Sequence, residues 1–150
     1  MSAHSRQGTF RRPAIRFVAW SLLLHWAWEV AHAPAYVETD MPPLDRIVHC
    51  APMALVDTAW AAVVVLAAHA VVARARERTA VIAAAAAALG AASAAVFEMW
   101  AVASGRWTYN DRMPLVPLIG AGLWPVLQMT ILPPLALWLS APRGDRRLLS

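Results

Sequence analysis

The sequence predicts an all-α protein, an antiparallel four-helix transmembrane bundle. Hydrophobic residues make up 60% of the 150 residues, charged residues only 15%, and the mean hydropathy is +0.50. A soluble domain carries about a quarter charged residues. The apolar residues form four blocks, each near the roughly 20 residues that a spanning helix needs: 14–33, 52–73, 80–103 and 117–140. We therefore expect one membrane domain over residues 1–150.

Prolines mark the expected ends of the first two helices. Pro13 suits a first helical position, so the first helix is expected to begin there, after a polar and basic tail. It is expected to end at Pro34, because proline interrupts a helix. Residues 34–51 are then the longest outer loop, and Pro52 begins the second helix.

The third and fourth helices are expected to pack closely against their neighbours. Residues 74–79 form a turn so short that the second and third helices must be antiparallel. The third helix is rich in alanine over 83–88 and in small residues over 90–95. Small residues let helix backbones approach closely in lipid. Pro133 and Pro134 are expected to kink the fourth helix.

The arginines predict the orientation. All 13 basic residues are arginines, and three of them, Arg46, Arg106 and Arg112, fall in the predicted outer loops. By the positive-inside rule both termini are cytoplasmic, in a multi-pass protein of the cytoplasmic (inner) membrane. Anionic lipids are the expected partners of the basic face, and nucleic acid is not expected. The other ten arginines form that face: Arg6, Arg11, Arg12, Arg16, Arg74, Arg76, Arg78, Arg143, Arg146 and Arg147.

The single cysteine, Cys50, falls in the predicted outer loop. One cysteine excludes an internal disulfide. A bridge between two chains is one interpretation, and a small buried hydrophobic side chain is the interpretation we favour.

Three acids, Glu29, Asp57 and Glu98, lie within the apolar blocks. An acid in hydrocarbon costs roughly 2.5–3.5 kcal/mol, so each is a candidate functional group. Each lies five to seven residues from the expected outer end of its helix, which places all three about 7–10 Å deep. We therefore expect one acidic layer in the outer half of the bilayer. The alternative is a structural role in hydrogen bonds or ion pairs between helices.

The acids have polar neighbours at helical spacing. His25, Glu29 and His32 follow one another at i, i+4 and i+7, which places them on one face of the first helix. Gln128 is the one polar side chain near the middle of the fourth helix. A pocket lined by these groups suits proton transfer. The candidate catalytic residues are Glu29, Asp57, Glu98, His25, His32 and Gln128.

A metal site is an alternative use of the same residues. Glu29 and His32 have the Glu-x-x-His spacing of di-iron carboxylate bundles, which need the motif twice. Ala101 stands where the motif beginning at Glu98 would need its histidine. A single zinc or iron on His25, Glu29 and His32, or on the two histidines with another acid, stays open. We predict no metal, and the sequence indicates no cofactor.

Aromatic residues surround the predicted acidic layer, since eight residues are tryptophans. The deeper ones are expected to line an apolar substrate cavity and to stabilise developing positive charge by cation–π attraction. These are Trp28, Trp60, Trp100 and Trp124. Trp107 and Tyr109, in the last outer loop, suit substrate binding or an ordinary interfacial aromatic belt.

Three motifs run along the chain: Trp28-Glu29-x-x-His32-x-Pro34, Gly105-Arg-Trp107-Thr-Tyr109-x-x-x-Met113-Pro114 and Gly120-x-Gly122-x-x-Pro125-x-x-Gln128. Together they resemble the motifs of small bacterial four-helix integral membrane proteins, a resemblance that implies the fold and no particular activity. A fainter similarity to membrane carotenoid-modifying and terpene-cyclising proteins implies, by analogy, carboxylates acting among aromatic residues.

The leading hypothesis is a membrane enzyme that uses carboxylate acid/base chemistry on a lipid or isoprenoid. A proton-coupled small transporter or channel subunit is the first alternative, because a glutamate in the first of four short helices is similar to the layout of small multidrug exporters. An accessory subunit of a larger membrane complex is the second. The sequence leaves homo-oligomerisation open.

Overall fold

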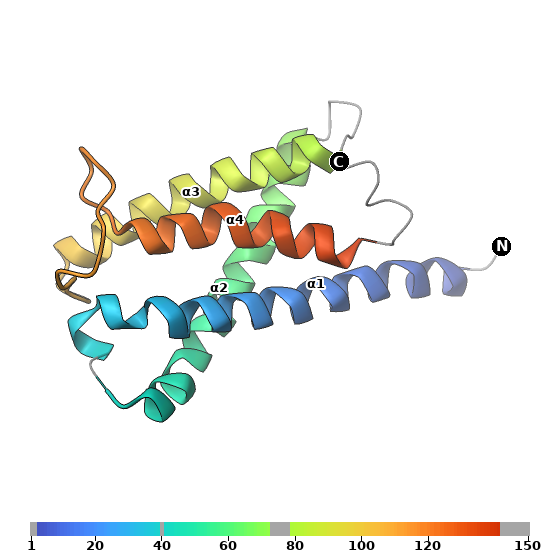
Figure 1. Cartoon of the computed structure of the whole chain (residues 1–150). Helices are drawn as coiled ribbons and strands as arrows, with labels where there is room; N and C mark the ends of the chain where they lie inside the picture. The colour runs from blue at the N-terminus through green and yellow to red at the C-terminus, as the bar shows by residue number, and fades with distance from the viewer. Residues whose placement is uncertain (1–2, 40, 73–78, 142–150) are drawn as a thin grey trace.

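The computed structural model describes residues 3–39, 41–72 and 79–141, with side chains from residue 13 onward, and these residues form four α-helices and no strand (Figure 1). Two short 3-10 turns, η1 (Ala33–Ala35) and η2 (Val37–Thr39), follow the first helix. The predicted all-α bundle is confirmed. The helices are α1 (Ala3–His32), α2 (Pro43–Val72), α3 (Thr79–Ala103) and α4 (Leu123–Ser140).

Consecutive helices run in opposite directions, and each of α1 and α3 packs against both α2 and α4. In Figure 1, α1, α3 and α4 lie roughly along one direction, whereas α2 crosses behind them at a steeper angle. The segment between α3 and α4 and the two 3-10 turns lie at one end of the bundle, which we call the loop end. The beginning of α1 and the end of α4 lie at the opposite end.

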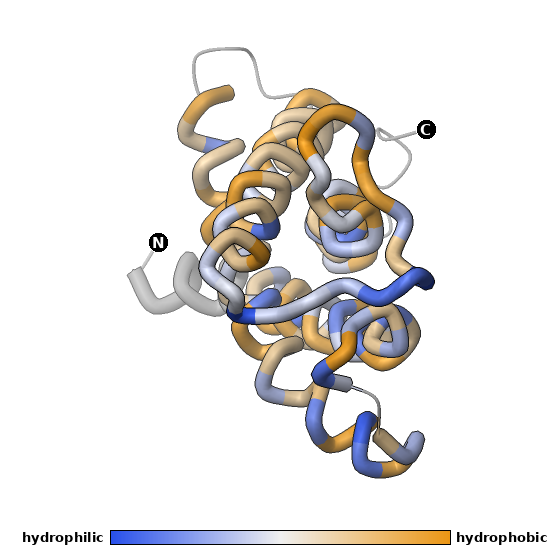
Figure 2. The backbone as a smooth tube through the Cα atoms, turned by 90° about the vertical axis from the view of Figure 1, so that its left-hand side faces the viewer, coloured by the Kyte–Doolittle hydropathy of each residue, from blue (hydrophilic) through white to orange (hydrophobic). Residues whose placement is uncertain are grey.

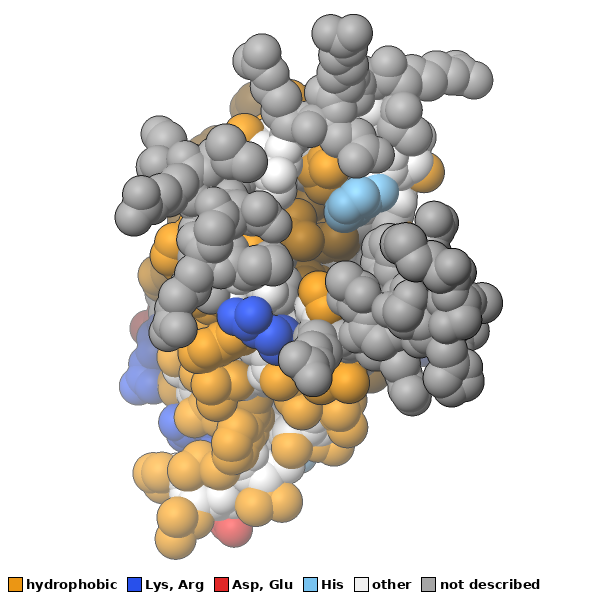
Figure 3. All heavy atoms as spheres, turned by 90° about the vertical axis from the view of Figure 1, so that its right-hand side faces the viewer, with side chains coloured by type: hydrophobic (Ala, Val, Ile, Leu, Met, Phe, Trp, Pro, Cys, Tyr) orange, Lys and Arg blue, Asp and Glu red, His pale blue; other side chains and the backbone are white. Residues whose placement is uncertain are grey.

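Three of the described helices, α2, α3 and α4, are long and apolar enough to cross a membrane. The outside of the bundle fits this, because large apolar side chains such as Leu66 and Val96, each 69% exposed, cover it. Figure 3 shows apolar side chains over much of the described surface seen from the end opposite the loop end. Helix α1 is more polar than the other three helices. Its residues Ser21, His25 and His32 are buried, whereas Ile15, Val18 and Leu23 face outward. The three apolar helices α2, α3 and α4 are compatible with an integral membrane protein.

Two predicted helix starts are wrong at the amino-terminal ends of α1 and α2. Helix α2 begins at Pro43, with Pro52 in its interior, so residues 43–51 are helical and not loop. Both prolines suit a first helical position, and Asp45 in the first turn favours the earlier start through the helix dipole. Helix α1 begins at Ala3, with Pro13 in its interior, where a single missing hydrogen bond is tolerated in so long a helix.

Helix α4 begins at Leu123 and not at residue 117. Leu118 and Gly120 have φ values of 73° and 68°, which no right-handed helix contains. The Val116 N–H donates to the Ala121 carbonyl at 2.8 Å and closes a tight turn before the helix. The predicted bounds of the third helix, 80–103, agree with the structure within one residue.

Cys50 lies inside α2 and not in a loop, and it is a free, buried cysteine with 2% of its surface exposed. The prediction of a small buried hydrophobic side chain is confirmed. Arg16 Nη2 donates to the Leu139 carbonyl at 3.2 Å and joins α1 to the end of α4. The other nine arginines of the basic face lie outside the residues whose side chains are described, so the cytoplasmic position of the termini stays a prediction.

Helices α3 and α4 make a close backbone contact at Gly90. A Cβ atom at this position would lie 2.0 Å from the Met129 carbonyl oxygen and 2.9 Å from its carbonyl carbon. This oxygen has no partner four residues along its own helix, because Pro133 lacks an N–H. Pro133 thus frees a carbonyl, and Gly90 gives it room against the neighbouring helix.

The half of the bundle away from the loop end has an apolar core. Phe17, Val126 and Leu137 pack against its edge. The described cluster contains only apolar side chains and, together with Phe17 of α1, extends over all four helices. The buried core residues are Ala61, Val64, Val65, Ala68, Val72, Ile82, Ala86, Ala94 and Met129.

Candidate functional site

Three helices bring polar side chains together around Gln128, which is 2% exposed. Its amide nitrogen Nε2 lies 3.0 Å from His25 Nδ1, 3.0 Å from Glu29 Oε1 and 2.9 Å from Asp57 Oδ2. His25 and Glu29 come from α1, Asp57 from α2 and Gln128 from α4. We call these four residues the carboxyl hub. They are four of the six predicted catalytic residues.

The local sequence explains why these side chains meet. His25 and Glu29 are one helical turn apart, so both point to the same side of α1. Asp57 is flanked on α2 by Ala54 and Ala61, which are fully buried and bring the α2 backbone close to its neighbours. Gln128 lies between buried Pro125 and Met129. Small residues around each polar group leave the room that the hub occupies.

The contacts within the carboxyl hub indicate how many protons its two carboxyls hold. Glu29 Oε1 and Asp57 Oδ2 each lie within 3.0 Å of the same amide nitrogen, so the two carboxyls share one site. Two carboxyls at one site disfavour a charge on both of them. The Gln128 amide has only two hydrogens for three neighbouring acceptors. This geometry favours one proton held by the pair, which is the arrangement that acid/base chemistry by two carboxyls uses.

The third acid, Glu98, lies beside the hub on α3 and is 4% exposed. It accepts a hydrogen bond from the Tyr109 hydroxyl, which in turn accepts one from the Gly122 N–H at 3.0 Å. Glu98 interacts electrostatically with both Glu29 and Asp57. The structure thus brings the three predicted acids into one region but gives them different partners.

His32 connects the hub to the loop end. Its Nδ1 donates to the Trp28 carbonyl at 2.8 Å, so a neutral His32 presents Nε2 as an acceptor. That nitrogen lies 3.9 Å from Glu29 Oε1. The ring also meets Tyr36 edge-on, at 5.6 Å between ring centroids. The separation of His32 Nε2 from Glu29 is longer than a hydrogen bond, so His32 lies beside Glu29 without bonding to it.

A segment between α3 and α4 covers the hub and Glu98 at the loop end. Figure 2 shows it crossing in front of the helix ends. Asn110 fixes it to η1, because Nδ2 donates to the Pro34 carbonyl at 2.9 Å and the backbone N–H to the Ala35 carbonyl at 3.1 Å. Tyr36 packs against Trp107 and Tyr109 across this junction. We call Tyr36, Trp107, Tyr109 and Asn110 the aromatic cap.

The predicted aromatic lining needs correction. Trp60, Trp100 and Trp124 lie on the outer surface of the bundle, between 37% and 48% exposed, and do not surround the acids. The helix faces that carry these three tryptophans point away from the interior of the bundle. The deeper half-buried Trp28 donates from Nε1 to the Trp124 carbonyl at 3.2 Å, and Trp60 Nε1 donates to Ser93 Oγ at 3.1 Å. Both rings therefore join neighbouring helices.

Trp107 and Tyr109 keep a place at the site, since both belong to the aromatic cap. Tyr36 and Asn110 are functional candidates that the sequence prediction did not include. The sequence gives only a weak indication of either residue. Tyr36 stands two residues after the motif that ends at Pro34, Asn110 lies inside the motif from Gly105 to Pro114, and neither residue carries a charge.

No group of three or more His, Cys, Asp or Glu side chains is placed to hold a metal ion in the described part of the chain. The alternative metal set of His25, Glu29 and His32 gains no support from the geometry. No family model, curated protein or solved structure matches the chain. The inference about function therefore rests on the geometry of the site.

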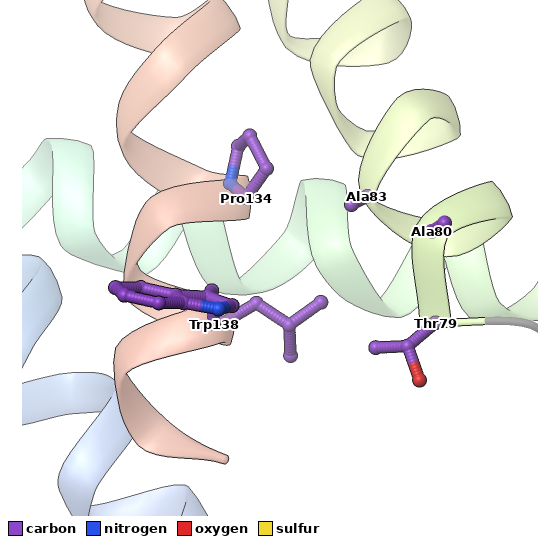
Figure 4. A pocket seen from close by; sticks show the side chains of 6 residues that line it. Thr79, Ala80, Ala83, Pro134 and Trp138 are labelled. Carbon is purple, nitrogen blue, oxygen red and sulfur yellow. The ribbon is translucent and has the colours of Figure 1, made fainter. Parts of the chain in front are cut away.

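A separate cavity of about 250 Å³ lies between the start of α3 and the end of α4 (Figure 4). It lies at the end opposite the acids and is distinct from the predicted site. Apart from the Thr79 hydroxyl, its walls are apolar or small side chains, which fit hydrocarbon rather than acid/base chemistry. The lining residues are Thr79, Ala80, Ala83, Pro134, Leu137 and Trp138.

Both tyrosines of the chain belong to the cap, and burial raises the pKa of Tyr36 and of Tyr109, with the nearby Glu98 adding to the rise. The unfolded chain ionises near the ordinary pKa of about 10. The tyrosines therefore stabilise the fold fully below that pH and lose this effect as the pH rises above it. We expect no tyrosinate absorbance from the folded protein in detergent up to about pH 11.

After denaturation, both tyrosines should titrate near the ordinary value. Tyr109→Phe should halve the total tyrosinate signal and serves as the control, because the chain has only two tyrosines. Free phenols titrate at about pH 10. If the tyrosines of the folded protein also titrated there, the cap would not bury them.

Proposed function

We propose that this protein is a membrane enzyme that transfers protons between the Glu29–Asp57 pair and a lipid or isoprenoid. The observation that carries the proposal is the convergence of both carboxyls and His25 on the Gln128 amide within 3.0 Å. A purely structural acid needs one partner. Two acids that share one proton hold a group that is able both to give a proton and to take one back.

Each residue has a role in this proposal. The protonated member of the pair donates to the substrate, and the resulting carboxylate later takes a proton from the substrate or from water. Gln128 positions both carboxyls. His32 Nε2 lies 3.9 Å from Glu29 Oε1, and a side-chain movement that shortens this distance to a hydrogen bond lets the two groups exchange a proton. Glu98 and Tyr109 form the wall toward the loop end. The apolar surroundings suit a substrate drawn from the bilayer, and membrane lipids are the partners that we propose.

Access to the hub supports an enzyme over a transporter. Glu29 and Asp57 are partly exposed, whereas Glu98 and Gln128 are buried, so a substrate reaches the pair first. The apolar core around Val64, Val65 and Ile82 closes the other half of the bundle. A proton-coupled transporter would need a path through that core. We propose that the loop end faces the outside of the cytoplasmic membrane, as the arginine distribution predicts.

The test uses the native host with the gene deleted and restored as wild type, Glu29→Gln or Asp57→Asn. We expect one lipid or isoprenoid class to change on deletion and to return only with the wild-type gene. Each variant should lower product formation by about a hundredfold or more, the usual contribution of a general acid or base. Lipid mass spectrometry measures the product, and Glu38→Gln, which alters an exposed acid of η2, is the matched control.

Identical lipid profiles in the deletion strain and the wild type would contradict the enzyme proposal. If proton-driven dye efflux from vesicles then depended on Glu29, transport would take its place. If neither assay responded while the protein co-purified with a larger membrane complex, an accessory role would be the better explanation.

A further inference from the structure

The carboxyl hub continues along α1 into two buried polar groups that have no partner. His25 and Ser21 are both 0% exposed. Among the described residues, neither His25 Nε2 nor Ser21 Oγ has a hydrogen-bond partner. An unpaired buried polar group costs about 1–3 kcal/mol, so two at one place require an explanation.

Ser21 departs from the ordinary behaviour of hydroxyls in these helices, as does Thr58 of α2, which follows Asp57 in the chain. A serine or threonine inside a helix usually donates to a carbonyl three or four residues earlier. Thr130 does so to Val126 at 2.6 Å, and Ser140 to Leu137 at 2.7 Å. Ser21 has no such bond. Its hydroxyl is therefore available to a group that lies inside the bundle.

The proton position on His25 follows from Gln128. The amide nitrogen faces His25 Nδ1, so this ring nitrogen is the acceptor. A neutral His25 then carries its proton on Nε2, where it needs an acceptor. The serine hydroxyl lies one helical turn away on the same face, with Cβ atoms about 5–6 Å apart. One water that makes two hydrogen bonds of about 2.8 Å spans that gap.

We propose that a buried water-binding site between His25 Nε2 and Ser21 Oγ fixes the orientation of the carboxyl hub. The water holds the His25 proton on Nε2, which keeps Nδ1 as the acceptor for one hydrogen of Gln128. Only one amide hydrogen then remains for the Glu29–Asp57 pair, so the pair keeps its own proton. The apolar core beyond Phe17 makes the water site a closed end and not a channel.

The inference deepens the proposed function, but its test does not depend on activity. Nitrogen NMR of the labelled protein in detergent reports the tautomer of His25, and magnetisation transfer reports contact between water and its N–H. We expect the Nε2–H tautomer with a cross-peak to water. Ser21→Ala should abolish that cross-peak, because the water loses its second partner, while the fold is kept.

Ser93→Ala is the matched control, because that hydroxyl bonds to the Gly90 carbonyl and to Trp60 and lies on another helix. It should leave the His25 signals unchanged. An Nδ1–H tautomer in the wild type, no water contact, or a water cross-peak that survives in Ser21→Ala would overturn the proposal. A negative lipid assay with the expected NMR result would overturn the enzyme function alone.

Discussion

Gly90→Ala is expected to destabilise the protein by about 3 kcal/mol or more, at or beyond the upper end of overpacking effects in cores. The added methyl group would lie 2.0 Å from the Met129 carbonyl oxygen. Both sides of this contact are backbone, so no side chain can rotate away. Helices α3 and α4 must separate or the contact must break. Reversible unfolding in mixed detergent measures the change in the free energy of unfolding.

Gly105→Ala is the matched control. Gly105 has φ +68°, so alanine is strained there, but no atom lies within 4 Å of the added Cβ. It should cost only about 1–2 kcal/mol, the penalty of a left-handed conformation. An equal loss in both variants would show that Gly90 has no special contact.

Pro133→Ala tests the contact between Gly90 and the Met129 carbonyl even if Gly90→Ala fails to fold. Pro133→Ala restores an N–H to which the Met129 carbonyl is able to bond along its own helix. This turns the carbonyl toward its helix axis and away from Gly90. The double variant should therefore fold better than Gly90→Ala alone, and a purely additive effect would contradict the link between proline and glycine.

The bundle itself was predictable because hydropathy and chain length decide it. Four apolar blocks joined by short connections leave few alternatives to an antiparallel bundle. Helix ends were less predictable, because proline signals a start equally well at Pro43 and Pro52. The turn before α4 depends on positive φ at Leu118, a residue type that gives no such signal.

The sequence indicated which polar side chains lie together, but it did not indicate the hydrogen-bond partners of each one. Helical spacing placed His25 and Glu29 together, and the apolar setting singled out Asp57 and Gln128. The predicted depth of Asp57 depends on a helix that starts at Pro52, whereas α2 starts at Pro43. The basis of that depth is therefore wrong, although Asp57 does contact Gln128. The sequence did not tell which face each tryptophan uses, because apolar groups surround a membrane helix on every side.

Gln128→Leu is the second variant with a large expected effect. The change keeps the volume but leaves His25, Glu29 and Asp57 without the amide that joins them. Hydrogen bonds between membrane helices contribute about 0.6 kcal/mol on average and up to about 1.7 kcal/mol. The two hydrogens of the amide allow two such bonds, which together give a loss of about 2 kcal/mol in the free energy of unfolding. Detergent unfolding measures it.

Thr130→Val, on the same helix, is the control. Its hydroxyl bonds only within α4, to Val126, so its loss should cost less than half as much. A double-mutant cycle with Asp57→Leu then measures the interaction between Gln128 and Asp57, apart from the effect of burying each polar group. If Gln128 holds the pair, removal of Asp57 should recover part of the Gln128→Leu loss, because fewer buried groups remain unpaired. Full additivity of the two substitutions would mean that the amide and the carboxyl act independently, and the shared proton would lose its structural basis.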